Sequence, residues 1–144
     1  MSRGARFAAT FATMFAAHHL GDYWIQTHAQ ARTKGDRTPA GRRACAAHVA
    51  TYTAGSALAV AGMSAALDLR LSWRSQLLAQ VISAGTHYWL DRRWTLDGLV
   101  NAIDPLTGKS TYLAEGGAPL LDQSAHLVCL AVASLVAARM DATP

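Results

Sequence analysis

The stretch His18-His19-Leu20-Gly21-Asp22-Tyr23-Trp24-Ile25-Gln26 places polar side chains inside an otherwise apolar N-terminal segment. His18, Asp22 and Gln26 follow one another at four-residue intervals, so on a helix they form one polar stripe along a single face. Burying a carboxylate and an imidazole in such a segment is costly unless they are paired or bind a metal. The stretch therefore predicts a helix that carries part of a polar site.

The same combination recurs in three further apolar segments. His48 stands in the second segment, the pair His87/Asp91 ends the third, and the pair Asp122/His126 begins the fourth. Both pairs have the i,i+4 spacing that brings two side chains together on a helix. This recurrence indicates a shared site rather than four unrelated polar positions.

The four apolar segments predict four long helices joined by short connections. Short connections favour antiparallel neighbours, so we expect an all-α fold, an up-down four-helix bundle with an irregular excursion between the third and fourth helices. The length suits one domain over residues 1–144. The expected long helices span about 6–28, 42–67, 75–91 and 119–139, and within the excursion a short helix is expected over 96–103, closed by Asp104-Pro105.

Composition leaves both a soluble bundle and one embedded in a membrane open, and the distribution of apolar residues along the chain favours the membrane. Hydrophobic residues make up 51% of the chain and charged residues only 15%, below the usual quarter for soluble domains. The second segment is longer than the roughly 20 residues that a bilayer core requires, and Gly55 and Gly62 suit close helix packing. We therefore expect a multi-pass protein of the cell membrane with the lipid bilayer as partner. Whether the chain also forms a homo-oligomer is left open.

An up-down topology places all the polar groups at one end of the bundle. Imidazoles and carboxylates together are ligands of Zn²⁺, Mn²⁺, Fe²⁺ or Ni²⁺. We expect zinc or manganese, either as two ions or as one ion whose histidines are oriented by neighbouring carboxylates; histidine–aspartate hydrogen bonds without a metal are the alternative. The predicted metal ligands are His18, Asp22, His48, His87, Asp91, Asp122 and His126.

The quoted motifs resemble the DUF3307 family of small, predominantly bacterial proteins, which are mostly predicted to sit in the membrane. The resemblance runs from residue 18 to residue 127 in order, and more distantly the chain is similar to membrane-associated metal-dependent hydrolases. It implies a His/Asp site without an assigned reaction. The stretches that carry it are 18–27, Lys34-Gly35, 47–53, 87–93 and 121–127.

The first functional hypothesis is a metal-dependent hydrolase that acts on a phosphoester or lipid-like substrate. A metal lowers the pKa of its bound water towards neutrality, and an aspartate free of the metal, or His19, serves as general base. The catalytic candidates are Asp22, Asp91 and Asp122. The candidates for binding a small anionic substrate are Arg92, Arg93, Lys34 and Gln26.

Two other hypotheses remain. A non-enzymatic membrane module, either a metal or proton sensor or a transport subunit, would also need ionisable residues inside the membrane. A basic regulator could contact nucleic acid through residues 32–43, but this cluster lacks a helix-turn-helix pattern and interleaved aromatics, which disfavours nucleic acid as a partner. Because basic loops face the cytoplasm, the loops around Lys34 and Arg92 place the site end there.

Overall fold

The computed structural model describes residues 2–141, which form helices and short connections with no strand among them. The all-α prediction is therefore confirmed. The long helices are α1 (Arg3–Leu20), α3 (Pro39–Ala66), α4 (Trp73–Asp91) and α7 (Ala118–Met140). The shorter elements are the π-helical turn η1 (Gly21–Ile25), α2 (His28–Thr33), α5 (Trp94–Thr107), α6 (Lys109–Tyr112) and the π-helical turn η2 (Leu113–Gly117).

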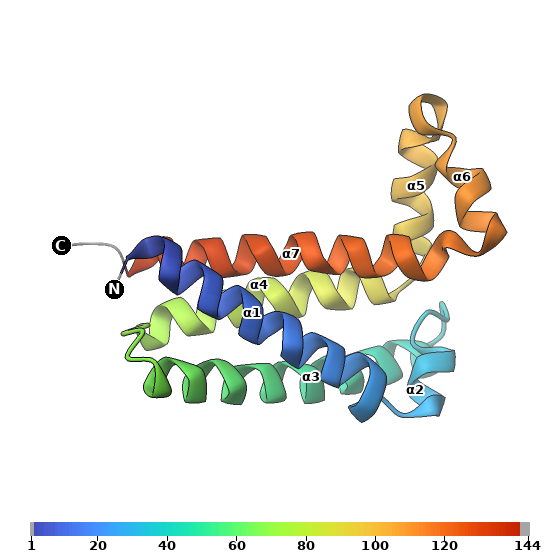
Figure 1. The fold of residues 1–144 in the computed structure, drawn as a ribbon. Helices are drawn as coiled ribbons and strands as arrows, with labels where there is room; N and C mark the ends of the chain where they lie inside the picture. The colour runs from blue at the N-terminus through green and yellow to red at the C-terminus, as the bar shows by residue number, and fades with distance from the viewer. Residues whose placement is uncertain (1, 142–144) are drawn as a thin grey trace.

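The four long helices lie side by side. α1 packs against α3 and α7, and α4 also packs against α3 and α7, so each long helix has two long neighbours. α1 is inclined across the others, while α5 and α6 stand away from the end of α7 (Figure 1). The connections that hold α2, α5 and α6 therefore lie at one end, and the α3–α4 connection lies at the other.

Hydroxyl side chains explain where several helices begin. The side chains of Ser2, Thr38 and Ser72 accept hydrogen bonds from the free backbone N–H groups in the first turns of α1, α3 and α4. Because Thr38 caps α3 and Pro39 follows it at the first helical position, the helix starts earlier than residue 42, where composition alone placed it.

The prediction of one continuous helix over residues 6–28 is wrong. α1 ends at Leu20, the π-helical turn follows, and Gln26 leaves helical geometry with a ψ of 127°. Gly21 lies against the ring of Tyr52, where an added Cβ would come within 3.1 Å of the ring. Thr27 then caps α2. The apolar run continues along the sequence after Leu20, but the π-helical turn and the cap at Thr27 divide it into separate elements.

The segment between α4 and α7 is helical rather than irregular. α5 extends the short helix expected over residues 96–103, and Pro105 lies within its last turn instead of ending it at Asp104. Gly108 and Gly116 take positive φ values of 63° and 99°, which a residue without Cβ adopts at little cost, and they turn the chain between these short helices.

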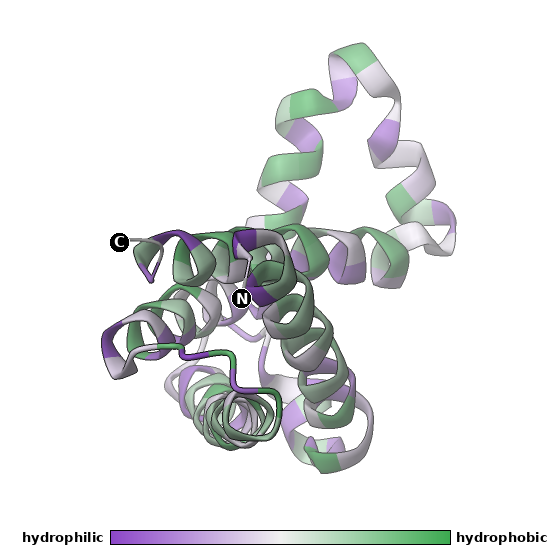
Figure 2. Cartoon of the chain, turned by 60° about the vertical axis from the view of Figure 1, so that its left-hand side comes forward, coloured by the Kyte–Doolittle hydropathy of each residue, from purple (hydrophilic) through white to green (hydrophobic). Residues whose placement is uncertain are grey.

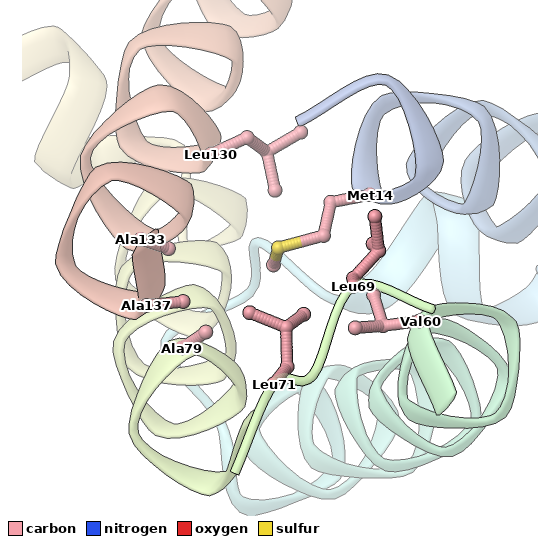
Figure 3. Close-up of a cluster of buried hydrophobic side chains, with 8 residues drawn as sticks. All are labelled: Met14, Val60, Leu69, Leu71, Ala79, Leu130, Ala133 and Ala137. Atoms are coloured by element: carbon pink, nitrogen blue, oxygen red, sulfur yellow. The ribbon is translucent and has the colours of Figure 1, made fainter. Parts of the chain in front are cut away.

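A cluster of buried apolar side chains packs between the long helices near the α3–α4 connection. Met14 from α1 points towards Leu69 and Leu71 of that connection, and small alanines of α4 and α7 let the helices approach (Figure 3). This far-end cluster comprises Met14, Val60, Leu69, Leu71, Ala79, Leu130, Ala133 and Ala137.

Large apolar side chains also cover much of the outer surface. Leu58, Leu77 and Val128 are more than half exposed, on three different long helices. Hydrophobic colour runs along the outer faces of the long helices in Figure 2. Among the described residues, two helical segments are long and apolar enough to cross a membrane, Pro39–Ala66 and Lys109–Met140. These features favour association with a membrane.

Candidate metal centre

The structure brings all seven predicted ligands to one end of the long helices. Asp22 comes from the π-helical turn, and the others come from the ends of α1, α3, α4 and α7 that lie nearest to it. Their nitrogen and oxygen atoms form three overlapping groups, each within 4.8 Å. These groups are His18/His87/His126, Asp22/His48/His87 and Asp91/Asp122/His126.

Two histidines and two aspartates form the centre of the cluster. The Nε2 atoms of His48 and His87 are 3.0 Å apart. Oδ1 of Asp22 lies 3.2 Å from the first nitrogen and 3.4 Å from the second, and Oδ2 of Asp91 lies 3.4 Å and 3.3 Å from them. Each of the two carboxylates thus contacts both imidazoles, and these contacts join η1, α3 and α4.

The remaining three ligands flank this centre. Nε2 of His18 lies 3.6 Å from Oδ2 of Asp22. On the side of α7, Nε2 of His126 lies 3.7 Å from one oxygen of Asp91 and 3.7 Å from one oxygen of Asp122. The four histidines are at most 2% exposed, whereas the Asp122 side chain is 26% exposed. Asp122 therefore faces the edge of the cluster.

The buried polar atoms of the cluster fit a bound cation. Both ring nitrogens of His18, Oδ1 of Asp22, Oδ2 of Asp91 and Nε2 of His126 make no hydrogen bond within the described part of the chain. Unsatisfied buried polar groups are rare because each costs about 1–3 kcal/mol. Divalent ions would engage one nitrogen of each imidazole and one oxygen of each carboxylate, and this nitrogen and oxygen donor set suits zinc or manganese.

Nearby charge keeps Asp22 ionised. Burial alone would raise the pKa of its carboxyl, but the His48 and His87 imidazoles outweigh that effect and hold the pKa well below its usual range. Asp22 is consequently available as an anionic ligand at neutral pH.

Tyr52 packs against the centre of the cluster. Its ring stacks on the imidazole of His87 with centroids 4.3 Å apart, and its hydroxyl lies 2.6 Å from Oγ of Ser83. Tyr52 is only 1% exposed. Sequence analysis did not identify this residue, although it lies one helical turn after His48 and therefore on the same face of the predicted helix.

Lys34 reaches the cluster from the loop after α2. Its Nζ lies 2.7 Å from Oδ1 of Asp91. Arg92 holds this loop in place, since its guanidinium donates to the carbonyl oxygens of Lys34, at 2.7 Å, and of Asp36. Arg92 is 5% exposed and committed to those carbonyls, so the structure places it behind the loop rather than at the cluster.

The other predicted substrate residues differ in position. Arg93 donates to the carbonyl oxygen of Ala31 and also lines a cleft of about 410 Å³ beside Asp91 and Asp122. Gln26 follows the π-helical turn; its backbone N–H donates to the Gly21 carbonyl oxygen, and its Nε2 is buried without a hydrogen-bond partner in the described part of the chain. The four-residue spacing predicts that Gln26 shares a helix face with His18 and Asp22 because it assumes one regular helix.

Two polar residues lie on the other side of the cluster, towards the gap between α1 and α7. His19 packs against Phe15 with ring centroids 4.2 Å apart, and its Nδ1 lies 3.1 Å from the Phe15 carbonyl oxygen. Gln123 donates from Nε2 towards Asp22 Oδ2 at 3.3 Å and Asp122 Oδ2 at 3.4 Å. Gln123 thus joins carboxylates that come from different elements.

One family model matches nearly the whole chain. Its description is "Protein of unknown function (DUF3307)", and it covers residues 10–143. Comparisons with curated proteins and with solved structures gave no match.

Proposed function

The chain belongs to the DUF3307 family of proteins of unknown function, and we propose that it is a membrane-embedded, metal-dependent hydrolase. Its site would lie at one end of a four-helix bundle and act on a phosphoester or lipid-like substrate. The observation that carries the proposal is the group of buried, unsatisfied imidazole and carboxylate atoms contributed by all four long helices.

The distribution of charge supports a multi-pass arrangement. Each long helix carries a stretch without Asp, Glu, Lys or Arg. The stretch in α3 is long enough for the ~30 Å of a hydrocarbon core, whereas the shorter stretches, of about 15 residues, reach ~23 Å, about three-quarters of that thickness. Many apolar side chains face outwards, while several serines and threonines and the four histidines of the cluster are buried. The charge-free stretches are residues 7–21, 44–67, 75–90 and 123–138.

The basic residues favour a cytoplasmic site. Of the 13 Lys and Arg residues, five lie towards the far end: Arg3, Arg6, Arg70, Arg74 and Arg139. The other eight are in or beside the connections at the site end. Because cytoplasmic loops carry the excess of Lys and Arg, this asymmetry supports a site that opens to the cytoplasm.

The ligand set supports one or two divalent ions, with zinc and manganese favoured. Seven potential ligands exceed the four of a closed structural zinc site, and dinuclear bundle proteins draw ligands from facing helices in a similar way. Three carboxylates would offset most of the charge of two ions. A bound ion would supply a Lewis acid and a water that is activated at neutral pH.

The two ends of the bundle differ in a way that favours catalysis over transport. The far-end cluster fills the bundle opposite the site with apolar side chains, whereas a transport path would need polar access from both ends. At the site end, the cleft is lined by Lys34 and Arg93 next to Asp91 and Asp122. Two cations beside a carboxylate cluster suit an anionic substrate held near a metal.

The proposed reaction is the hydrolysis of a phosphate ester. The oxygen of water forms a new bond to phosphorus, the bond from phosphorus to the ester oxygen breaks, and the departing oxygen takes a proton to leave as an alcohol. Asp122, the more exposed carboxylate at the cluster's edge, is placed to accept the proton of the attacking water. Lys34 and Arg93 would hold the phosphate.

Metal analysis and a hydrolysis assay together test the proposal. Protein purified without added metal should contain stoichiometric transition metal and should hydrolyse phenyl phosphate. His87→Ala should lose both properties, while His28→Ala, at an exposed residue that begins α2, should keep both. Absence of stoichiometric metal from the native protein would refute the metal site. Metal without hydrolysis of any phosphoester would refute the enzyme and leave a sensor.

A further inference from the structure

A pocket of about 190 Å³ lies between α1 and α7, on the side of the cluster where Gln123 stands. It is separate from the cleft at Lys34, which is lined by other residues. Both openings reach members of the cluster, because this pocket includes His18 and the cleft includes Asp91 and Asp122. The lining residues of the pocket are Phe15, His18, His19, Gln123, Ser124, Leu127 and Leu130.

The pocket has an apolar wall and a polar floor. Phe15, Leu127 and Leu130 belong to the charge-free stretches of α1 and α7, which the proposed arrangement places within the bilayer. At the floor, His18 is 1% exposed and neither of its ring nitrogens has a hydrogen-bond partner in the described part of the chain. A buried imidazole without partners at the bottom of an apolar opening points to a ligand with a polar end.

Gln123 connects this floor to the cluster. Its Nε2 contacts Asp22 and Asp122, while its Oε1 is buried without a hydrogen-bond partner. The amide is therefore fixed by the two carboxylates and presents a free acceptor to whatever occupies the site. This position suits a residue that orients a head group carrying a hydroxyl.

From this arrangement we infer that the substrate is a single-chain amphiphile with a phosphate head group, which enters from the bilayer between α1 and α7. The apolar chain would lie against Phe15 and Leu127, and the phosphate would reach the cluster past His18 and Gln123. This inference rests on the proposed function and adds the substrate class and the route. The cleft at Lys34 then serves for the entry of water and the release of phosphate.

The volume of the pocket limits the occupant. Pockets for drug-sized ligands usually measure about 300–1,000 Å³, so a pocket of 190 Å³ holds part of one chain rather than a drug-sized ligand. The groove between α3 and α4 is larger, about 690 Å³, but the residues that line it include none of the seven predicted ligands. Size alone would favour that groove, whereas continuity with the cluster favours the pocket between α1 and α7.

Two matched tryptophan variants test the route. Leu127→Trp fills the mouth of the pocket, whereas Val128→Trp changes the next residue, which is 64% exposed and outside the lining. The measurement is the ratio of hydrolysis rates for dodecyl phosphate in mixed micelles and phenyl phosphate in water. We expect Leu127→Trp to lower this ratio at least about tenfold, the effect of losing burial of two methylene groups, and Val128→Trp to leave it unchanged.

Photolabelling of the native chain provides a readout independent of catalysis and of the folding of a variant. A dodecyl phosphonate with a diazirine in its chain would be bound to protein in detergent, with and without metal, and crosslinked peptides would be identified by mass spectrometry. Labels on Phe15 and Leu127 support the route. Labels concentrated on Leu77 and Ala84 of the α3–α4 groove, or an unchanged rate ratio in Leu127→Trp, would overturn it. If native protein hydrolyses neither probe, the proposed function fails instead.

Discussion

The Nε2 atoms of His48 and His87 face each other at 3.0 Å, and both lie within 3.4 Å of one oxygen of Asp22 and one of Asp91. The two Nε2 atoms together carry at most two protons. Separate hydrogen bonds between the two imidazoles and to each of the two carboxylates would need three. A cation at this point would replace the competing contacts with ligand bonds. Several consequences of this arrangement can be measured.

Metal should stabilise the folded chain. A divalent ion at about 100 times its Kd raises the free energy of unfolding by about 2.7 kcal/mol if it binds the folded state alone. We expect EDTA to lower the Tm of the native protein in detergent and added zinc or manganese to restore it. His48→Ala should abolish the response, and His28→Ala should retain it. A Tm that is insensitive to EDTA and to both ions would contradict the metal site.

The buried pair of Lys34 and Asp91 should matter far more than an exposed pair. Removing one partner of a buried pair costs about 3–5 kcal/mol, whereas exposed pairs contribute up to about 1 kcal/mol. Lys34→Met should therefore lower the free energy of unfolding by about 3 kcal/mol. Arg70→Met is the control, because Arg70 pairs with Asp68 and both side chains are about three-quarters exposed. Equal effects in denaturant titrations would show that Lys34 is not held against Asp91.

Gly41 should tolerate no side chain. A Cβ there would overlap the carbonyl oxygen of Asp36 and lie 2.8 Å from that of Thr33, both in the loop segment that presents Lys34. Gly41→Ala should destabilise the protein by about 1–3 kcal/mol, the usual cost of overpacking. Gly62 has nothing within 4 Å of an added Cβ, so Gly62→Ala should be neutral or stabilising by up to about 1 kcal/mol. The two variants can be compared by thermal denaturation, where a stable Gly41→Ala would disprove the close approach.

Tyr52 should position His87 mainly through its ring. Tyr52→Phe keeps the stacking but leaves the Ser83 hydroxyl without its partner, which should cost about 1–2 kcal/mol of stability and little metal affinity. Tyr52→Leu removes the ring and should weaken metal binding, measured by competition with a fluorescent chelator, more than Tyr52→Phe does. Equal affinities in the two variants would rule out a positioning role for the ring.

The proposed orientation can be tested with single cysteines. In a background with Cys45 and Cys129 replaced by serine, Arg37→Cys reports on the site end and Arg70→Cys on the far end. A membrane-impermeant maleimide added to intact cells should label Arg70→Cys and should label Arg37→Cys only after the membrane is opened. The opposite pattern would reverse the orientation, and labelling of both in intact cells would contradict a spanning arrangement.

Much of the cluster could be predicted from the sequence because its pairs are local. His87 with Asp91, and Asp122 with His126, need only a regular helix to meet, and antiparallel connections bring the helix ends together. The end of the helix before Gln26 could not be predicted, since it depends on the cap at Thr27 and on the close packing of Gly21 on Tyr52. The contact of Lys34 with Asp91 depends on a loop held by Arg92, and no periodicity reveals such a contact. Within residues 94–117 only the short helix over 96–103 could be predicted, because the turn residues that follow it suggest loops.

The far-end cluster of Met14, Leu69, Leu71 and their neighbours also determines how the site would acquire its ion. With that end filled, a metal ion would enter the proposed site from the compartment that the basic loops face. Zinc binds nitrogen and oxygen sites more tightly than manganese in the general affinity order, so affinity alone would not select manganese. The resident metal would then follow the free-ion concentrations of that compartment, and protein made in zinc-rich and manganese-rich cells would differ in the ion it carries.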